Sequence, residues 1–187
     1  CGELVAQLLA LPVMEVRALD NNENSLFFLE QEHNDDARFH AFLCDVREEN
    51  KLRSMFRGMD FVFHVAALKH VPLCERSPTE AVRTNIEGVE NVIRAAIDED
   101  VKKVLFTSSD KAVNPTNVMG TSKLMGERLI TAANALTQTE HGTIFSSTRF
   151  GNVAGSAGSV VPLFCQQIAA GKNLTLTHPD MTRFLMT

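Results

Sequence analysis

Hydrophobic residues along the chain fall into two kinds of segment that alternate. Five short runs are rich in apolar, β-branched and aromatic residues, and each precedes a segment with apolar residues at helical spacing. These runs are residues 13–20, 38–45, 61–67, 102–109 and 142–150. Strands that alternate with helices predict βαβ units, and therefore a parallel sheet with helices on both faces.

The pattern predicts an α/β fold with a doubly wound, Rossmann-like parallel sheet. Residues 1–11 have helical spacing, and no strand comes before them. In dinucleotide-binding folds a strand and a glycine-rich turn precede the first helix. We therefore expect residues 1–187 to be a truncated, partial NAD-binding domain. It would have a gap beside strand 13–20, no pyrophosphate-binding turn, and only the start of a substrate-binding region from about residue 152.

Composition excludes several classes of protein. The chain has 18 Lys and Arg against 23 Asp and Glu, a net charge of −5, and the basic residues are scattered, so we expect no nucleic-acid partner. No apolar run approaches the roughly 20 residues of a membrane span, so we expect no membrane segment in this chain and a cytoplasmic location. The four cysteines have no metal-ligand spacing, which predicts reduced thiols and no metal site.

Two acidic residues end the first two predicted strands. Asp20 lies where a carboxylate accepts from a ribose 2′-hydroxyl, and Asn21 and its neighbours offer no cation for a 2′-phosphate, which favours NAD over NADP. Asp45 could accept from the adenine amino group while the amide of Val46 serves a ring nitrogen. The alternative is that Asp20, Asn22 or Asp45 simply caps the following helix.

Small residues follow the third predicted strand. Ala66 and Ala67 would let the backbone approach a pyrophosphate or a ribose, although small residues at a strand end are also common in ordinary packing. Because ligands of open α/β sheets bind at the carboxyl ends of the strands, we expect this segment to lie near the ends of the other strands.

The fourth predicted strand ends in Ser109, Asp110 and Lys111, and the helix after it carries Met119 and Lys123. The last two are four residues apart on one helix face, with the spacing of a Tyr-x-x-x-Lys catalytic motif. The chain contains no Tyr, and a thioether cannot accept a proton. A base must therefore come from Asp110 or Lys111. The alternatives are a surface ion pair for these two residues, a core-filling Met119 and a solvated Lys123.

Residues 108–123, together with 18–23, 66–72 and 149–164, resemble the polysaccharide-biosynthesis branch of the extended short-chain dehydrogenases. Within that branch the sequence is most similar to the UDP-N-acetylglucosamine 4,6-dehydratases, in a subclass with Met in place of Tyr. The resemblance covers essentially the whole chain. It implies a UDP-sugar substrate, NAD as cofactor, and a homo-oligomer at full length. Some long members of the subclass are membrane-anchored, which leaves open an anchored parent with a cytoplasmic catalytic domain.

The resemblance also implies a chemistry. Hydride leaves C4 of the hexose for NAD, a base removes the proton at C5, the C6 hydroxyl departs as water, and hydride returns to C6. Lys111 would be the base, Asp110 the acid that protonates the hydroxyl, and Ser109 a hydrogen-bond partner of the C4 oxygen. Lys123 would hold the nicotinamide ribose. A lysine base needs a lowered pKa, which Lys123 or Lys69 could provide.

Further residues carry over from the family by position. Lys69 would line the cofactor and substrate pocket, His70 the substrate pocket, and Asn85 would steady the active-site loop. Asn152 and Arg183 would contact the sugar nucleotide, the arginine at a phosphate.

Two other functions remain open at this point. An epimerase on the same scaffold would need no acid at C6, whereas the Asp110–Lys111 pair favours dehydration. A dinucleotide-binding protein that has lost catalysis would explain the Met in place of Tyr.

Overall fold

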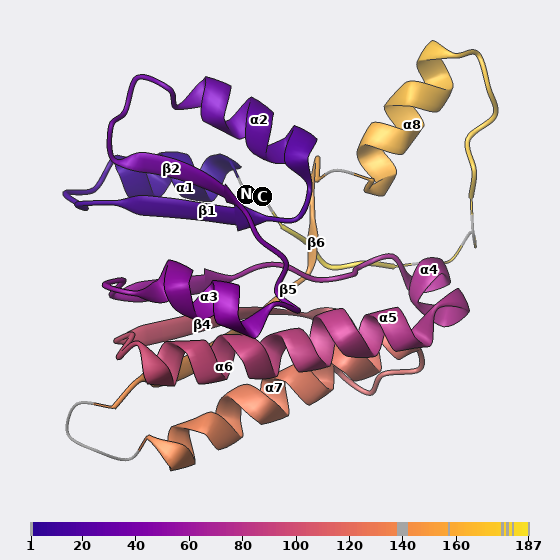
Figure 1. Ribbon diagram of the computed structural model, residues 1–187. Helices are drawn as coiled ribbons and strands as arrows, with labels where there is room; N and C mark the ends of the chain where they lie inside the picture. Colours follow the sequence, from indigo (N-terminus) through magenta and orange to yellow (C-terminus); the bar gives the residue numbers. More distant parts are fainter. Residues whose placement is uncertain are drawn as a thin grey trace.

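The computed structural model of the chain describes residues 2–137, 142–156, 158–176, 178, 180 and 182–186. Strands and helices alternate over most of this part, as the sequence predicts (Figure 1). In chain order the elements are α1 (Gly2–Leu9), β1 (Val16–Asp20), α2 (Glu23–Glu32), β2 (Phe39–Leu43), α3 (Glu49–Phe56), β3 (Phe61–His64), α4 (Val71–Arg76), α5 (Pro78–Val82), the π-helical turn η1 (Arg83–Glu87), α6 (Gly88–Asp98), β4 (Lys103–Ser109), the 3₁₀ turn η2 (Asp110–Ala112), α7 (Val118–Leu136), β5 (Ile144–Phe150), β6 (Asn152–Val153), α8 (Val160–Ala169) and β7 (Leu185–Met186).

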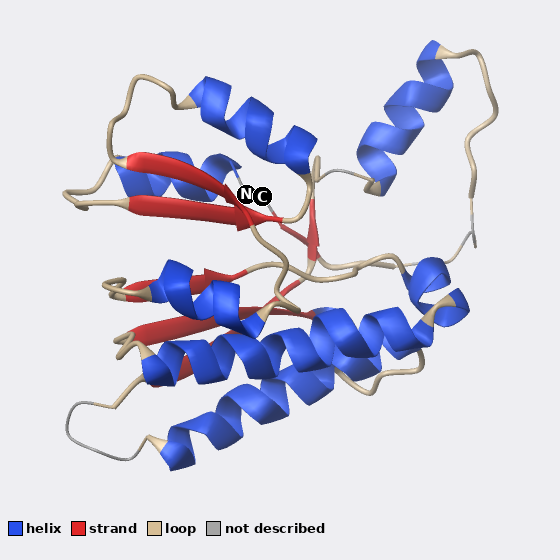
Figure 2. Cartoon of the chain, in the orientation of Figure 1, coloured by secondary structure: helices blue, strands red, loops and turns tan. Residues whose placement is uncertain are grey.

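The strands form a parallel sheet that is interrupted. β1 pairs with β2, with Val16 opposite Phe39, and β3, β4 and β5 form a second parallel group in that order. Figure 2 shows the two groups apart. Within the described part of the chain, β1 pairs along one edge only, with β2, and β3 pairs along one edge only, with β4. The predicted parallel α/β fold and the predicted gap beside strand 13–20 are both confirmed.

The main hydrophobic core lies on one face of the β3–β4–β5 group. Helices α3, α6 and α7 cover this face, and Phe106 and Ile130 are each 1% exposed. On the other face Phe61 and Phe63 stay 58% and 36% exposed beside a hollow of about 230 Å³. The expectation of helices on both faces is thus met on one side of this group only.

A smaller core holds the N-terminal part together. Val5 and Leu9 of α1 pack against Val16 of β1 and Phe39 of β2, as the helical spacing of residues 1–11 predicts. The amphipathic segment 77–100 contains α5, η1 and α6 in turn.

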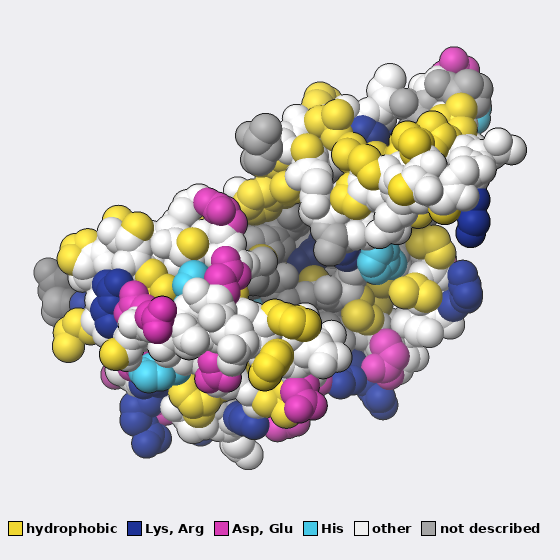
Figure 3. All heavy atoms as spheres, turned by 90° about the horizontal axis from the view of Figure 1, so that it is seen from above, with side chains coloured by type: hydrophobic (Ala, Val, Ile, Leu, Met, Phe, Trp, Pro, Cys, Tyr) yellow, Lys and Arg dark blue, Asp and Glu magenta, His cyan; other side chains and the backbone are white. Residues whose placement is uncertain are grey.

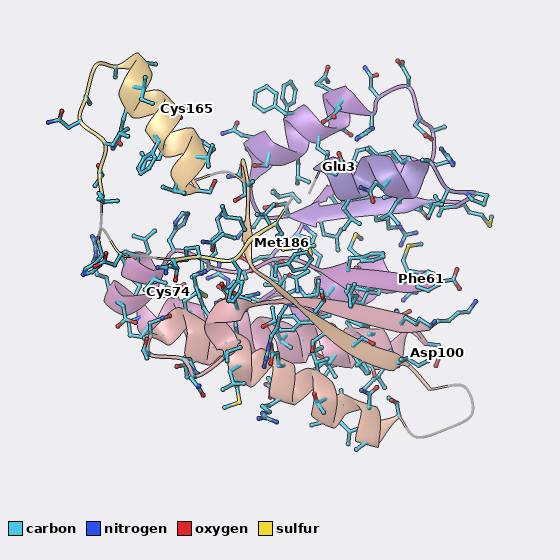
Figure 4. The ribbon with its side chains drawn as sticks, turned by 180° about the vertical axis from the view of Figure 1, so that it is seen from behind. Glu3, Phe61, Cys74, Asp100, Cys165 and Met186 are labelled. Carbon is cyan, nitrogen blue, oxygen red and sulfur yellow. The ribbon has the colours of Figure 1, made fainter. Side chains whose placement is uncertain are left out.

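Helix α8 contrasts with the other α-helices described because none of its residues is buried. Its exposed apolar side chains belong to the hydrophobic lobe on the right of Figure 3. Figure 4, where Cys165 marks α8 and Phe61 marks the start of β3, shows the helix standing apart from the strands.

The described cysteines are free thiols. Cys44 and Cys74 are buried free thiols and Cys165 is an exposed one, whereas Cys1 lies outside the described residues. Among the residues with described positions, no group of His, Cys, Asp and Glu side chains could hold a metal ion. None of the helices in this part is long and apolar enough to cross a bilayer.

Candidate active site

The carboxyl ends of β1 and β2 bring three of the predicted cofactor residues together. Asn21 donates a hydrogen bond to Asp45 across 3.2 Å. Asp20 accepts from the amide of Asn22 at 2.9 Å, and Asn22 caps α2. The helix-capping alternative is therefore correct for Asn22. Asp20 stabilises the turn before α2 by accepting from the amide of Asn22.

Asp45 is already well supplied with donors. Arg47 donates to both carboxylate oxygens through its side chain, and its backbone amide adds a further hydrogen bond. The hydrogen bonds from Arg47 lower the pKa of Asp45 to about 2. Val46, next in sequence, accepts from the side chain of Asn91 at 3.0 Å, which ties this loop to α6. Because a carboxylate has about four acceptor sites, an adenine amino group would have to share or displace a donor here.

The predicted acid–base pair lies at the carboxyl end of β4. The ammonium of Lys111 donates to Asp110 Oδ1 at 3.0 Å and to Asn152 Oδ1 at 3.1 Å. Ser109 donates to the same oxygen of Asp110 at 3.0 Å and accepts from the amide of Lys111 at 3.3 Å. The side chains of Lys111 and Asp110 are 34% and 27% exposed. The pair is thus half-buried in a hydrogen-bonded cluster that also includes Asn152, which the sequence did not link to Lys111.

The carboxyl group of Asp110 is held in its ionised form. Burial raises its pKa, but the hydrogen bonds from Lys111 and Ser109 lower the pKa by more, so the net shift is downward. Asp110 and Lys111 therefore form an ion pair in the free protein.

Lys123 is buried, so the alternative of a solvated helix lysine is wrong. Its side chain, on a residue 6% exposed, donates to the carbonyl of Thr107 at 2.9 Å, and its ammonium lies 4.7 Å from the centre of the Phe106 ring. Burial lowers the pKa of Lys123 to about 8. The lysine thus reaches β4 close to Ser109, from the helix that packs under the sheet.

Met119 lies one turn before Lys123 and is also buried. At 3% exposure it packs with Cys74, which Figure 4 labels, and with Ala81. This environment agrees with the core-filling alternative, and it leaves no proton acceptor at the position of the motif's tyrosine.

Asn85 clamps the loop after β3. Its side chain accepts from the amide of Leu68 at 2.8 Å and donates to the Leu68 carbonyl at 2.9 Å. It also donates to the hydroxyl of Ser122 on α7 at 2.9 Å. The residue is 1% exposed. The expectation that Asn85 steadies this loop agrees with this geometry, and Ser122 is the partner that sequence reasoning missed.

The remaining predicted residues lie on the loops around this end of the sheet. Ala66, Lys69 and His70 are exposed and Ala67 is partly buried, and the ring of His70 lies against Gly158. Arg183 is exposed and donates to the carbonyl of Thr182. In the view from above, the surface is hollowed between the α8 lobe and the rest, with basic and histidine side chains around the hollow (Figure 3).

One buried titratable residue was not singled out from the sequence. His64, at the end of β3, is 4% exposed and its ring centre lies 5.6 Å from that of Phe106. Burial, together with the nearby charge of Lys123, lowers the pKa of His64 to about 3. It is therefore neutral, and a histidine inside an apolar strand is a signal that could have marked it.

Comparisons with known sequences find similar proteins over most of the chain. The profile of the polysaccharide biosynthesis protein family matches residues 1–187. An uncharacterized membrane protein of Methanocaldococcus jannaschii is 51% identical over 185 residues, which is 99% of this chain and 55% of that protein. A UDP-glucose 4-epimerase of Rickettsia bellii is 51% identical over 146 residues, 78% of this chain and 42% of its own length. The chain thus spans about half the length of these relatives.

Solved structures agree with the fold. The X-ray structure of Pen from Bacillus thuringiensis is 44% identical with a TM-score of 0.95, and the match covers 98% of this chain and 58% of that one. A dTDP-glucose 4,6-dehydratase from Streptomyces venezuelae, determined with NAD bound, is 23% identical with a TM-score of 0.87, covering 98% and 63%. The second likeness concerns the fold alone.

Proposed function

Since the chain belongs to the polysaccharide biosynthesis protein family, we propose that the full-length protein is a nucleotide-sugar 4,6-dehydratase acting on UDP-N-acetylglucosamine. The observation that supports this activity best is the Asp110–Lys111 pair, joined at 3.0 Å at the carboxyl end of β4. Removal of water across C5 and C6 of a 4-keto hexose needs a base and an acid side by side. This pair supplies both.

The protons balance within the pair. In the free protein Lys111 is an ammonium and Asp110 a carboxylate. Transfer of one proton along their hydrogen bond gives an amine and a carboxylic acid. Lys111 then takes the proton from C5, the C6–oxygen bond breaks, and Asp110 gives its proton to the departing hydroxyl. Water leaves, and the pair is again an ammonium and a carboxylate. When hydride returns to C6, Lys111 would give its proton to C5, and the proton lost from the C4 hydroxyl on formation of the 4-keto sugar would restore the ammonium.

A bound sugar would favour the neutral form of the pair. Covering these two half-buried side chains removes water from both charges, which raises the pKa of a carboxyl group and lowers that of an amine. The proton transfer from Lys111 to Asp110 therefore becomes easier when the substrate closes over them. Ser109 would break its hydrogen bond to Asp110 and donate to the C4 oxygen of the sugar instead.

NAD is the cofactor that these residues fit best. Asp20 has a carboxylate at the end of β1, and no Lys or Arg follows it to meet a 2′-phosphate. Lys123 offers a cation close to the end of β4, where it would reach the ribose hydroxyls. NAD, when bound, supplies the acceptor and donor of hydride that the reaction needs. Asn21, Asp45, Val46, Ala66, Ala67 and Lys69 would complete this site.

The sugar nucleotide would bind over the same end of the sheet. Lys69, His70 and Arg183 are exposed there and could meet its hydroxyl and phosphate groups. Asn152 would contact the sugar only after a change in its bond to Lys111.

A second candidate is a C4 epimerase. The similarity to the UDP-glucose 4-epimerase of Rickettsia bellii favours it. That reaction uses the 4-keto sugar but needs neither a base at C5 nor an acid at C6. A third candidate, a catalytically silent dinucleotide-binding protein, is favoured by Met119 in the place of a tyrosine.

Incubation of the full-length protein with UDP-N-acetylglucosamine and NAD separates the three, with NMR of the products as readout. A dehydratase gives a UDP-4-keto-6-deoxy sugar. A C4-epimerized isomer without loss of water would favour the epimerase instead, and NAD binding without any product would leave only the silent protein.

A further inference from the structure

In the described part of the chain, the ammonium of Lys111 donates to two side-chain oxygens. Besides Asp110, its ammonium donates to Asn152 Oδ1 at 3.1 Å. Asp110 lies next to it in the chain, whereas Asn152 comes from β6, far along the sequence. The tertiary fold therefore places a neutral amide oxygen on the proposed base.

The backbone fixes Asn152 at this position. Its amide donates to the carbonyl of Phe184 at 2.8 Å, and β6 pairs with β7 so that Asn152 lies opposite Leu185. Gly151 lies so close to Phe184 that a Cβ there would meet its carbonyl oxygen at 2.9 Å. The side chain of Asn152 is thus presented to Lys111 by an anchored backbone.

We propose that Asn152 is a positioning residue that sets the protonation of Lys111, in addition to any contact with the sugar. This inference rests on the proposed function. The amide oxygen and the carboxylate of Asp110 together stabilise the ammonium, because both accept hydrogen bonds from it. Lys111 can act as a base only after it gives up a proton, so the hydrogen bond that it donates to Asn152 opposes the step. A sugar hydroxyl that donates a hydrogen bond to the side-chain oxygen of Asn152 would replace Lys111 there. Lys111 would then lose its proton more easily and become the neutral amine.

The charged neighbours of Lys111 are few, which makes the effect of Asn152 measurable. Among the residues described, Asp110 on η2 forms the ion pair with Lys111. On α7, Lys123 directs its ammonium to the carbonyl of Thr107, and before β7, Arg183 donates to Thr182. Lys69 comes from the loop after β3. A carboxylate introduced at residue 152 would lie within hydrogen-bond distance of Lys111, whereas Lys123 and Arg183 donate to other oxygens.

The test uses the full-length protein with NAD and three variants. Asn152→Asp adds an opposite charge that favours the ammonium over the amine, so kcat for water elimination should fall about tenfold. The midpoint of the alkaline fall in kcat, where the pair loses its proton to solvent, should rise by about one unit. Asn152→Ala removes an acceptor, and the midpoint should move to lower pH. Asn152→Ser keeps an acceptor oxygen, and the midpoint should stay near that of the wild type. Asn173→Asp, the same change at an exposed residue, serves as the matched control.

A second readout does not need turnover. The pKa of Lys111 can be followed by NMR of isotope-methylated lysines, with its signal assigned by loss in Lys111→Arg. We expect a higher pKa in Asn152→Asp and a lower one in Asn152→Ala. If the variants change KM alone, with unaltered pH midpoints and an unaltered lysine pKa, the positioning role is wrong. If the wild type makes no keto sugar, the proposed function fails, while the NMR titration still decides the role of Asn152.

Discussion

The carbonyl oxygen of Lys111 packs against Gly120, so closely that a Cβ on residue 120 would overlap it. The same Cβ would lie 3.1 Å from the side chain of Pro115. Since Gly120 lies in the first turn of α7, this contact sets η2 against the helix that carries Met119 and Lys123. The proposed acid–base pair is therefore positioned by helix α7 through a site that accepts only glycine.

Gly120→Ala should displace the backbone of Lys111. A misplacement of about 1 Å in an active site can cost on the order of 10²-fold in rate, so we expect a loss of that size in kcat with NAD affinity retained. Steady-state kinetics and NAD titration of the full-length protein measure both. Thr121→Ala, at the next and exposed position, is the control and should keep the wild-type rate. A Gly120→Ala enzyme as active as the wild type would show that the contact is unimportant.

Lys111→Ala should abolish elimination of water and leave NAD binding intact, because it removes the base without touching the proposed cofactor residues. Lys111→Arg keeps the positive charge beside Asp110 but stays protonated at any relevant pH, so it should also be inactive. Product NMR and NAD titration check the two expectations. Unchanged turnover in either variant rules out Lys111 as the base.

Lys123 should make the stability of the protein depend on pH. Its pKa falls from 10.5 to about 8 on folding. Between these values the unfolded chain binds more protons than the folded one, so stability rises with pH across this window. Below about pH 8 the full penalty of about 3 kcal/mol for burying the charge is present.

Lys123→Met keeps the bulk of the side chain without its charge. At pH 7 we expect this variant to be more stable than the wild type, by up to about 3 kcal/mol, with the difference shrinking as the pH rises from 8 to 10. Urea unfolding of both proteins across this range gives the free energies. A difference that does not vary with pH would contradict the lowered pKa of Lys123.

Asn85→Ala should destabilise the protein because it removes the three hydrogen bonds of a buried side chain. The amide and carbonyl of Leu68 and the hydroxyl of Ser122 all lose a contact. We expect a loss of about 1–3 kcal/mol in the free energy of unfolding. Asn173→Ala, at an exposed asparagine, is the matched control and should unfold like the wild type in urea. Equal stability of the two variants would mean that the clamp is not needed.

The sequence was informative where local patterns determine structure. The apolar run 102–109 contains all of β4 and ends where that strand ends, because a buried strand needs consecutive apolar residues. Met119 and Lys123 share the buried face of α7 as their spacing predicts.

Contacts between distant segments could not be predicted in this way. β6 and β7 have two residues each, too few to show a period, and they pair across a long stretch of chain. The hydrogen bond between Lys111 and Asn152 depends on that pairing.

The fate of a deuterium placed at C4 of UDP-N-acetylglucosamine tests the central claim most directly. Full-length protein with NAD in H₂O should give a 4-keto-6-deoxy sugar that carries the deuterium at C6. In D₂O with unlabelled substrate, solvent deuterium should enter at C5, and Lys111→Ala should yield neither product. A product that has kept its C6 hydroxyl and its deuterium at C4 would contradict the account, because the Asp110–Lys111 pair would then have eliminated no water.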